Sequence, residues 1–399
     1  GNSCNLDIFY LRSHSLASTQ AAIVHQFGVH PAICQQRSLS RHNYPASKMH
    51  QISEKEAKLY DRQIRVWGME AQKRMRNARV CVIRFAGMAV EVVKNLVLAG
   101  IGELTILEDK KATDEDLGYN FFLTAKDVGA LRSKAAIPQI NALNPNVKVT
   151  TESDMKLALD SKFLSSFQVV ICSDCPFALQ AKINDACRNT SEGASGPVFF
   201  SSLTFGISSY FFKDVGPSFK YSVKKKNMDD GTTETHMQEI SGTKLSDILA
   251  SLSFDGCKSA LGRKGRRHLQ LMTVIATHMH SSTNNNEEKL AVDLKSLQKS
   301  RSALGTTQFP DSKLPDSALS DTSRQPGLAL APVLSISGGM LAQETLKIIS
   351  RVGKPYKNSI LFDGFLGGAI EFGLQDKKVV APKSTKATKK RKAESVILL

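Results

Sequence analysis

Short apolar runs alternate with longer amphipathic segments through the first half of the chain. A run such as Arg79–Ile83 has the length and the continuous apolar character of a buried strand rather than of a helix. The predicted strands are 79–83, 104–107, 147–151, 168–172 and 198–202, and the predicted helices between them are 90–99, 131–143 and 177–189. This alternation predicts a doubly wound α/β fold, in which a mainly parallel sheet carries helices on both faces.

The pattern extends beyond this central block in both directions. Residues 53–76 are amphipathic with helical spacing, and they begin with Ser53 and Glu56, the two residues of a capping box. Toward the other end, the sequence predicts a helix of small and apolar residues over 333–350, followed by strands over 359–362 and 369–372. We therefore expect the last part of the chain to return to the same α/β domain.

The stretch between these blocks has a weaker pattern. Order falls away after Phe212, and residues 225–244 are mostly polar. Two segments, 248–252 and 268–278, have helical spacing. Residues 281–325 are rich in Ser, Asn, Asp, Lys and Pro, which is typical of a long surface insertion or a disordered loop. We expect a helical and partly disordered insertion, whose fold the sequence leaves open.

Both ends of the chain lack the pattern of a folded domain. Residues 1–48 begin with Gly, are rich in Ser and His, and contain one acidic residue, Asp7. They are typical of a transit peptide or of upstream sequence translated ahead of Met49. We favour the second interpretation because the capping box follows Met49 closely. Residues 376–399 have no apolar periodicity, so we expect a disordered tail.

These observations divide the chain into five predicted parts. They are 1–48, a disordered or non-native extension; 49–215, a Rossmann-like domain; 216–330, the insertion; 331–375, the return of the α/β fold; and 376–399, the basic tail.

A net charge of +16 is typical of nucleic-acid-binding proteins, but the position of the charge along the chain argues against that function. More than half of it lies in the two ends, and the tail alone carries eight bases against two acids. Within the middle, the clusters 224–226 and 263–267 are typical of a solvated face. Aromatic residues are 7% of the chain and do not alternate with the bases, so we expect no nucleic-acid partner. The run Lys389–Lys392 indicates a nuclear address instead.

The cysteines and the hydropathy exclude other classes of protein. Seven cysteines in 399 residues indicate a reducing compartment rather than a disulfide framework. Cys172 and Cys175 form a lone CxxC at the end of an apolar run, and without a second pair we expect buried thiols and no metal site. The mean hydropathy is −0.19 and no apolar stretch is long enough to span a membrane, so we expect no membrane association.

The turn after the first strand lacks the glycines of a nucleotide-binding loop. Such a loop needs bare backbone amides close to phosphate, whereas residues 84–90 contain one glycine, Gly87, and begin with the bulky Arg84 and Phe85. Glu108 ends the second strand, where an acid could hold a ribose, but the loop before it is wrong for that ligand. The sequence therefore predicts a nucleotide-type fold without a nucleotide pocket of its own.

Four segments carry a resemblance to a known family. They are Tyr60–Gly68 (YDRQIRVWG), Lys94–Gly100 (KNLVLAG), Gly338–Glu344 (GGMLAQE) and Phe362–Gly364 (FDG). Together they resemble the small, non-cysteine subunit of SUMO-activating enzymes, within the ubiquitin-activating superfamily. The resemblance covers about residues 53–375, with 213–330 aligning loosely.

The resemblance implies a heterodimer in which each subunit contributes a Rossmann-like adenylation fold. The large subunit adenylates SUMO, binds ATP and Mg, and carries the catalytic cysteine, while the small subunit is a pseudoenzyme. The sequence agrees, since the stretch after the second strand has Asn120 but no Arg, and Lys110 lies where an active half has an Asp for magnesium. Asp174 and Lys134 resemble surviving positions of the active site. We therefore expect no ATP or metal bound by this chain, and a nuclear protein.

One positive role is implied by the same resemblance. The arginine of the family's Tyr-Asp-Arg-Gln motif corresponds to Arg62 and reaches across the dimer to the ATP phosphates of the partner. A guanidinium there neutralises developing phosphate charge. The simpler interpretation is that Arg62 pairs with a neighbour on its own helix.

Two other interpretations remain open at this stage. The small subunit of the NEDD8-activating enzyme resembles this chain at its start but is longer in its middle. A Rossmann oxidoreductase that uses NAD is a different class, and the missing glycines argue against it.

Overall fold

The computed structural model describes residues 51–374, apart from 190–195, 227–232, 264, 266–267, 286–293, 305–315 and 324. The expectations for residues 1–48 and 376–399, and for the nuclear address at Lys389–Lys392, lie outside the described residues and stay predictions.

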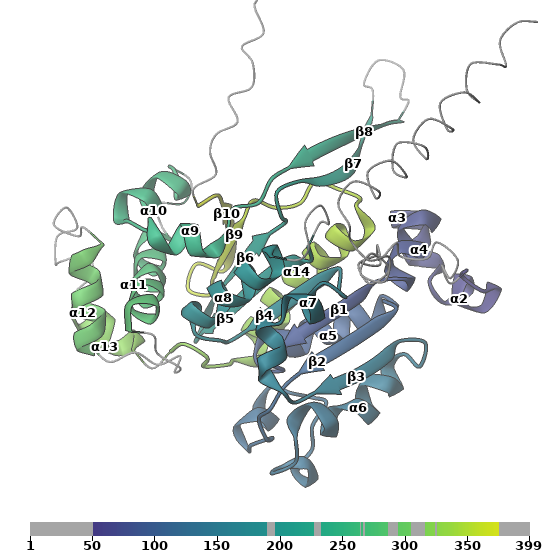
Figure 1. Cartoon of the computed structure of the whole chain (residues 1–399), viewed down its shortest axis with the longest axis horizontal. Helices are drawn as coiled ribbons and strands as arrows, with labels where there is room; N and C mark the ends of the chain where they lie inside the picture. The colour runs from purple at the N-terminus through teal and green to yellow at the C-terminus, as the bar shows by residue number, and fades with distance from the viewer. Residues whose placement is uncertain are drawn as a thin grey trace, which may run out of the picture. The chain divides into compact units, whose positions relative to one another are not determined.

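An eight-stranded sheet organises the described chain, in the order β10-β9-β6-β5-β4-β1-β2-β3 (Figure 1). Its strands are β1 Arg79–Ile83, β2 Glu103–Leu107, β3 Lys148–Glu152, β4 Val169–Ser173, β5 Val198–Phe205, β6 Ser208–Asp214, β9 Ser359–Asp363 and β10 Gly368–Phe372. Strands β5, β4, β1, β2 and β3 pair in parallel, and β6, β9 and β10 pair antiparallel. The predicted doubly wound α/β fold is confirmed.

Helices cover both faces of this sheet. Some helices pack on the sheet and others pack on those helices. The helices of the described chain are α2 Glu54–Leu59, α3 Asp61–Trp67, α4 Met69–Arg76, α5 Met88–Leu98, α6 Arg132–Leu143, α7 Ser161–Leu164, α8 Phe177–Arg188, α9 Leu245–Ala250, α10 Phe254–Leu261, α11 Leu269–Asn285, α12 Leu294–Ala303, α13 Asp316–Thr322 and α14 Ala331–Ser350. Alternate residues of one strand enter two separate cores. In β1, Val80 and Val82 join α4, α5, α6 and α14, while Cys81 and Ile83 join α8 and α11. Burial on both faces explains why the central strands read as continuous apolar runs.

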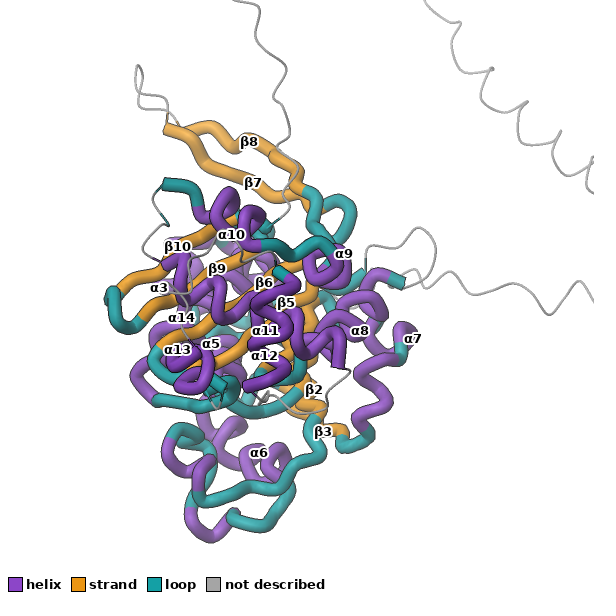
Figure 2. Tube along the Cα trace, turned by 90° about the vertical axis from the view of Figure 1, so that its left-hand side faces the viewer, coloured by secondary structure: helices purple, strands orange, loops and turns teal. Residues whose placement is uncertain are grey.

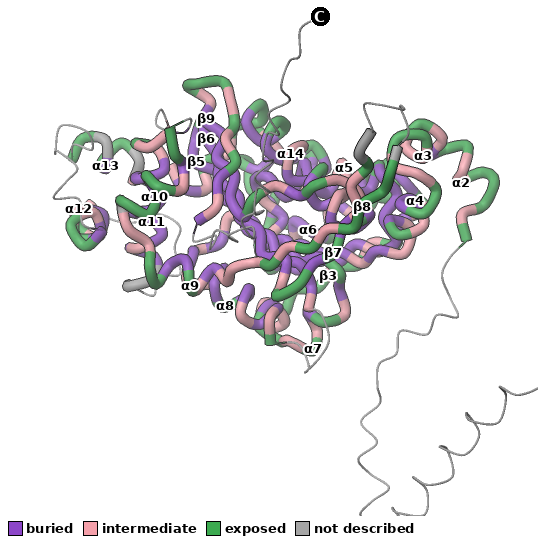
Figure 3. The backbone as a smooth tube through the Cα atoms, turned by 90° about the horizontal axis from the view of Figure 1, so that it is seen from above, coloured by how far each residue is buried: buried purple, intermediate pink, exposed green. Residues whose placement is uncertain are grey.

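The predicted helical stretch 53–76 is three short helices instead of one. Its capping box is present, because Ser53 Oγ accepts a hydrogen bond from Glu56 N at 3.2 Å and Glu56 Oε2 accepts one from Ser53 N at 3.0 Å. Tyr60 ends α2, and Gly68 separates α3 from α4 with φ = 92°, a conformation that favours glycine. These breaks leave α2 and α3 largely exposed (Figure 3).

The expectation that order falls away after Phe212 is wrong. Strand β6 continues to Asp214, and the polar stretch that follows forms an antiparallel hairpin of β7 (Phe219–Lys226) and β8 (Thr233–Ile240). Figure 2 shows this hairpin standing away from the main sheet. Phe219 and Tyr221 of β7 are buried, whereas β8 is mostly exposed, so the apolar alternation covers only the first residues of β7 and is too short a signal to predict a hairpin.

The interpretation of residues 281–325 as a long surface insertion or a disordered loop is also wrong in part, because the described residues of this segment include helices. Helix α11 continues to Asn285, and α12 and α13 follow. In α12 the buried residues are Leu297 and Ser300, so one narrow contact stripe holds a helix that is otherwise polar. Such a short stripe is too weak a periodic signal to predict the helix. No described helix combines the length and the apolar character needed to cross a membrane.

Candidate functional site

The cleft at the carboxyl ends of β1, β2 and β4 is where a nucleotide would bind in a doubly wound fold. The turn after β1 enters it with two residues in the left-handed region, Arg84 at φ = 68° and Gly87 at φ = 55°. A Cβ on Gly87 would lie 1.8 Å from Asp174 Oδ2, so only glycine fits there. The turn is therefore packed tightly against the chain that follows β4.

Glu108, at the end of β2, is fully buried and has its carboxylate oxygens occupied by the protein itself. Oε2 accepts hydrogen bonds from Phe85 N at 2.9 Å and from Arg132 Nη2 at 2.6 Å. Oε1 accepts from Lys110 N at 2.9 Å and from Arg84 Nη1 at 3.1 Å. With both oxygens engaged, this acid is not available to hold a ribose.

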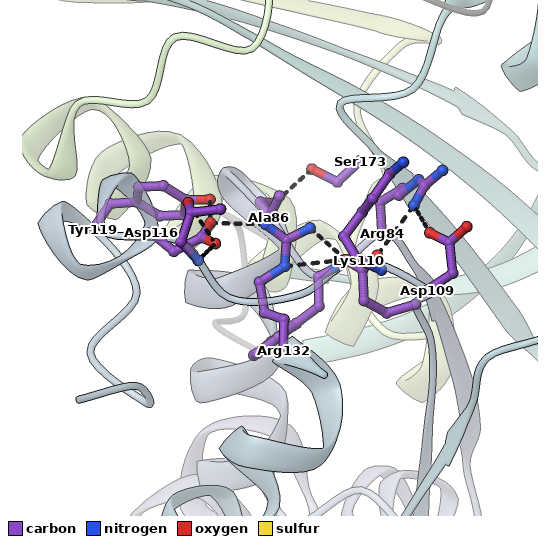
Figure 4. A network of polar contacts seen from close by, with 11 residues as sticks. Arg84, Ala86, Asp109, Lys110, Asp116, Tyr119, Arg132 and Ser173 are labelled. Atoms are coloured by element: carbon purple, nitrogen blue, oxygen red, sulfur yellow. Dashed lines mark hydrogen bonds and ion pairs between the residues drawn. The ribbon is translucent and has the colours of Figure 1, made fainter. Parts of the chain in front are cut away.

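Arg132 connects Glu108 to a second buried acid, Asp116. Its Nη1 lies 2.7 Å from Asp116 Oδ1, which also accepts a hydrogen bond from Tyr119 Oη at 2.5 Å. Burial would raise the pKa of Asp116, but the hydrogen bonds of Tyr119 and Thr113 and the charge of Arg132 lower it below its ordinary value. Figure 4 shows Arg132 reaching toward Asp116 and Tyr119 on one side, with Arg84 and Asp109 on the other.

Arg84, in the turn after β1, lies in the same cleft. Its guanidinium pairs with Asp109 as well as with Glu108, and Phe85 beside it is fully buried. We name Arg84, Glu108, Arg132, Asp116 and Tyr119 the cleft network. Arg84 and Phe85 lie in the loop after β1, where a phosphate-binding loop needs bare backbone.

Asp174 follows β4 in the left-handed region, with φ = 47°. Its Oδ1 accepts hydrogen bonds from Thr204 N at 2.8 Å and from Thr204 Oγ1 at 2.7 Å. Burial raises the pKa of Asp174 to about 6, against the lowering effect of these hydrogen bonds. Asp174 thus ties the turn at Gly87 to β5.

The remaining positions that resembled an active site do not assemble into one. Asn120 is buried, and its Oδ1 accepts from Phe122 N at 3.2 Å. Lys110 and Lys134 are exposed. A magnesium ion needs several oxygen ligands, whereas Glu108, the acid of this cleft that ends β2, is bound by two arginines. The residues present therefore do not fit Mg together with a triphosphate.

Arg62 lies on the exposed helix α3, apart from the cleft network. Its neighbours Asp61 and Arg65 pair with each other at 2.8 Å. Among the described residues no ion pair of Arg62 is found, so the simpler interpretation, a bond to a neighbour on its own helix, does not account for it.

The cysteines of the CxxC are buried, as expected from the apolar strand before them. Cys172 is in β4 and Cys175 follows it, and burial raises the pKa of the Cys172 thiol well above its ordinary value. Within the described part of the chain, no three His, Cys, Asp or Glu side chains gather as metal ligands would.

Sequence reasoning missed Arg132, Asp116 and Tyr119. Arg132 opens α6 and Asp116 lies in a short 3-10 helix, Glu115–Gly118, so neither follows a strand directly. The one available signal was Glu108 itself, because an acid buried at the end of a strand needs a cation as its partner.

A family model described as the ThiF family matches residues 60–375. This chain belongs to the ThiF family. Three of its relatives share the name "SUMO-activating enzyme subunit 1". The rat protein is 30% identical over 341 residues, which cover 80% of this chain and 94% of the relative. The human protein is 28% identical over 339 residues (80% and 95%), and the Dictyostelium discoideum protein is 29% identical over 324 residues (80% and 94%).

The resemblance to the small subunit of the SUMO-activating enzyme is thereby confirmed for this ThiF-family chain. The relatives favour it over both alternatives, the NEDD8-activating small subunit and the NAD-dependent oxidoreductase.

The cleft network gives a first prediction. Arg132→Ala should lower the free energy of unfolding by about 3 kcal/mol, because it leaves two buried carboxylates without their shared cation. Urea unfolding followed by circular dichroism measures the change. Arg65→Ala, which breaks the exposed pair with Asp61, is the matched control and should change little. Equal effects of the two substitutions would contradict the role of the network.

Asp174 gives a pH-dependent prediction. Its pKa is higher in the folded than in the unfolded chain, so the folded state binds the proton more tightly, and stability falls as pH rises from about 4 to about 6. Asp174→Asn keeps an acceptor for Thr204 and removes the charge. The variant should therefore gain on the order of 2 kcal/mol relative to the wild type across that interval. Parallel stability curves for the two proteins would refute the shift.

Proposed function

We propose that this chain is the non-catalytic subunit of a heterodimeric SUMO-activating enzyme. In this role it supports two reactions on the large subunit, the ATP-dependent adenylation of the SUMO C-terminus and the formation of a thioester. The relatives named SUMO-activating enzyme subunit 1 support the pathway. The observation that carries the non-catalytic role is the cleft network, which fills the nucleotide cleft of this chain with its own ion pairs.

The proposal assigns ATP and Mg to the large subunit. Bound to this chain, a ribose and phosphates would have to displace Arg84 and Arg132 from Glu108 and leave a buried carboxylate unpaired. Breaking a buried pair in that way costs several kcal/mol, which nucleotide binding would have to offset. The isolated chain is therefore proposed to be inactive and to need its partner.

Arg62 is proposed to act on the ATP of the large subunit. In adenylation the SUMO carboxylate attacks the α-phosphate and pyrophosphate leaves, so negative charge shifts onto the departing phosphates. A guanidinium can bind phosphate oxygens through two parallel hydrogen bonds and stabilise that charge. Exposure and the lack of an ion pair among the described residues leave the Arg62 side chain available for this contact.

The surface around Arg62 has the apolar character of an interface with another protein subunit. Val66 lies one helical turn beyond Arg62 on α3 and is 73% exposed, and Leu59 at the end of α2 is 63% exposed. Apolar side chains of this size beside a charged residue are typical of a protein interface. They would anchor the helix that carries Arg62.

Helix α14 offers a second face for the large subunit. Pro332 and Ile336 are exposed one turn apart, with Ile336 at 50%. Gly339 follows on the same side, and a Cβ there would meet no atom within 4 Å. A glycine inside a helix costs about 1 kcal/mol relative to alanine, and no described neighbour requires it. Close approach of a partner backbone would explain it.

The role of Arg62 is tested in the reconstituted heterodimer. Arg62→Ala should leave the complex intact and slow ATP–pyrophosphate exchange by about a hundredfold, which is the scale of losing one fixed group that stabilises transition-state charge. Arg65→Ala, three residues along the same helix, is the matched control and should keep wild-type exchange. The chain without its partner should give none. Wild-type exchange by the Arg62 variant would sink the assigned role.

The proposed contact of α14 with the large subunit is tested by placing a larger side chain at Gly339. Gly339→Leu should weaken association with the large subunit by about tenfold or more, because the added side chain holds the two backbones apart. The melting temperature of the isolated chain should not fall, since open space surrounds this position. Ala303→Leu, at an exposed position of α12, is the control and should associate normally. Normal association of the Gly339 variant would remove this face from the interface.

A further inference from the structure

A cavity of about 1190 Å³ lies at the edge of the sheet opposite the nucleotide cleft. Its walls come from the base of the β7–β8 hairpin, the segment 240–247 and the loop 354–358. Asp214 at the end of β6 pairs with Phe199 near the start of β5, which places this cavity at the amino ends of the parallel strands. It is therefore separate from the cleft network and from any nucleotide chemistry of the fold.

Two of the cations that line the cavity are neutralised inside the protein. Arg188 pairs with Asp214 at 2.6 Å and also donates to Gly242 O at 2.8 Å. Lys213 pairs with Glu344 at 2.5 Å. These buried pairs fix the floor of the cavity and leave no charge there for a ligand.

The lysines at the rim are different. Lys354 and Lys357 are exposed, and neither forms an ion pair among the described residues. Lys244 lies 4.0 Å from Asp185, at the limit of an ion pair. The acids of the lining are Glu239, which accepts a hydrogen bond from Ser218 and lies opposite Lys220 in the hairpin register, and Asp247.

Apolar surface lies between these charges. Tyr221, Ile240, Pro355 and Tyr356 contribute to the walls of the cavity. Ile240 and Tyr356 are partly exposed, and a site that combines such side chains with lysines at its rim suits an extended peptide whose side chains alternate between carboxylate and apolar. The volume exceeds that of most small-molecule pockets, which also favours a peptide.

The chain's own tail is an unsuitable occupant. Asn358, which lines the cavity, holds Leu374 through hydrogen bonds of 2.7 and 2.9 Å, and residues 375–399 follow Leu374 in the sequence. That segment carries eight bases and two acids and would be repelled by the rim lysines.

We propose that this cavity binds an extended acidic segment of another protein. Lys244, Lys354 and Lys357 contact the carboxylates, and the apolar walls take the side chains between them. The site does not depend on the subunit's role in adenylation.

The test uses fluorescence polarisation with the full chain and a labelled peptide in which pairs of acidic residues alternate with leucine. The peptide should bind, and its affinity should fall as salt rises. Its counterpart with Gln and Asn in place of the acids should bind at least about tenfold more weakly. The triple variant K244E/K354E/K357E should lose at least about tenfold in affinity for the acidic peptide. The control K126E/K134E/K162E, which reverses three exposed lysines outside the lining, should keep wild-type affinity.

Three results would overturn the proposal. Equal binding of the acidic and neutral peptides would show that the lysines do not recognise carboxylates. Unchanged affinity in the cavity variant, with loss on deleting residues 376–399, would assign binding to the tail. A single-stranded oligonucleotide that binds more tightly than the peptide, and loses affinity in the same triple variant, would assign the cavity to nucleic acid. Pyrophosphate exchange by the triple variant in the heterodimer, expected at the wild-type rate, separates this site from the proposed function.

Discussion

The carboxylate of Glu108 is fully buried at the end of a central strand, and the two guanidinium groups of Arg84 and Arg132 hold it there. A buried charge without partners is prohibitively unstable, so this acid requires both cations and the backbone amides around it. The position of Arg132 in turn brings in Asp116 and Tyr119. The state of the whole cleft thus follows from the need to neutralise one carboxylate.

The fold does not depend on this cleft, because its stability comes from elsewhere. Alternate side chains of the central strands enter two apolar cores, one on each face of the sheet, and neither core needs a nucleotide. A doubly wound sheet can therefore keep its architecture while the loop at its carboxyl edge exchanges glycines for Arg84 and Phe85. Function belongs to the site and not to the fold.

In the proposed subunit, the features available for function lie on the exposed surface. Helix α3 is held on one side by hydrogen bonds of Gln63 and by the packing of Trp67, and Arg62 is exposed. The face of α14 around Ile336 and Gly339 likewise has features that the described chain does not use. Both fit a protein whose contribution is made against a partner, since unused apolar surface is stabilised only when something covers it.

The sequence by itself determined whatever depends on neighbours along the chain. The capping box at Ser53 and the strand at Arg79–Ile83 are local patterns, and the structure has both. The missing glycines around Gly87 also followed from the sequence, because a phosphate loop is a local requirement on the backbone.

Only the tertiary structure decided what depends on distant partners. Arg132 reaches Glu108 across 24 residues, and no local pattern announces that pairing. The β7–β8 hairpin and helix α12 were likewise missed, because the apolar alternation of β7 and the buried stripe of α12 are each only two or three residues long. The physical reason is the same in each case. The spacing of apolar residues along the chain indicates which face of a helix or strand is buried. It does not indicate which other segment packs against that face, because that depends on the tertiary fold.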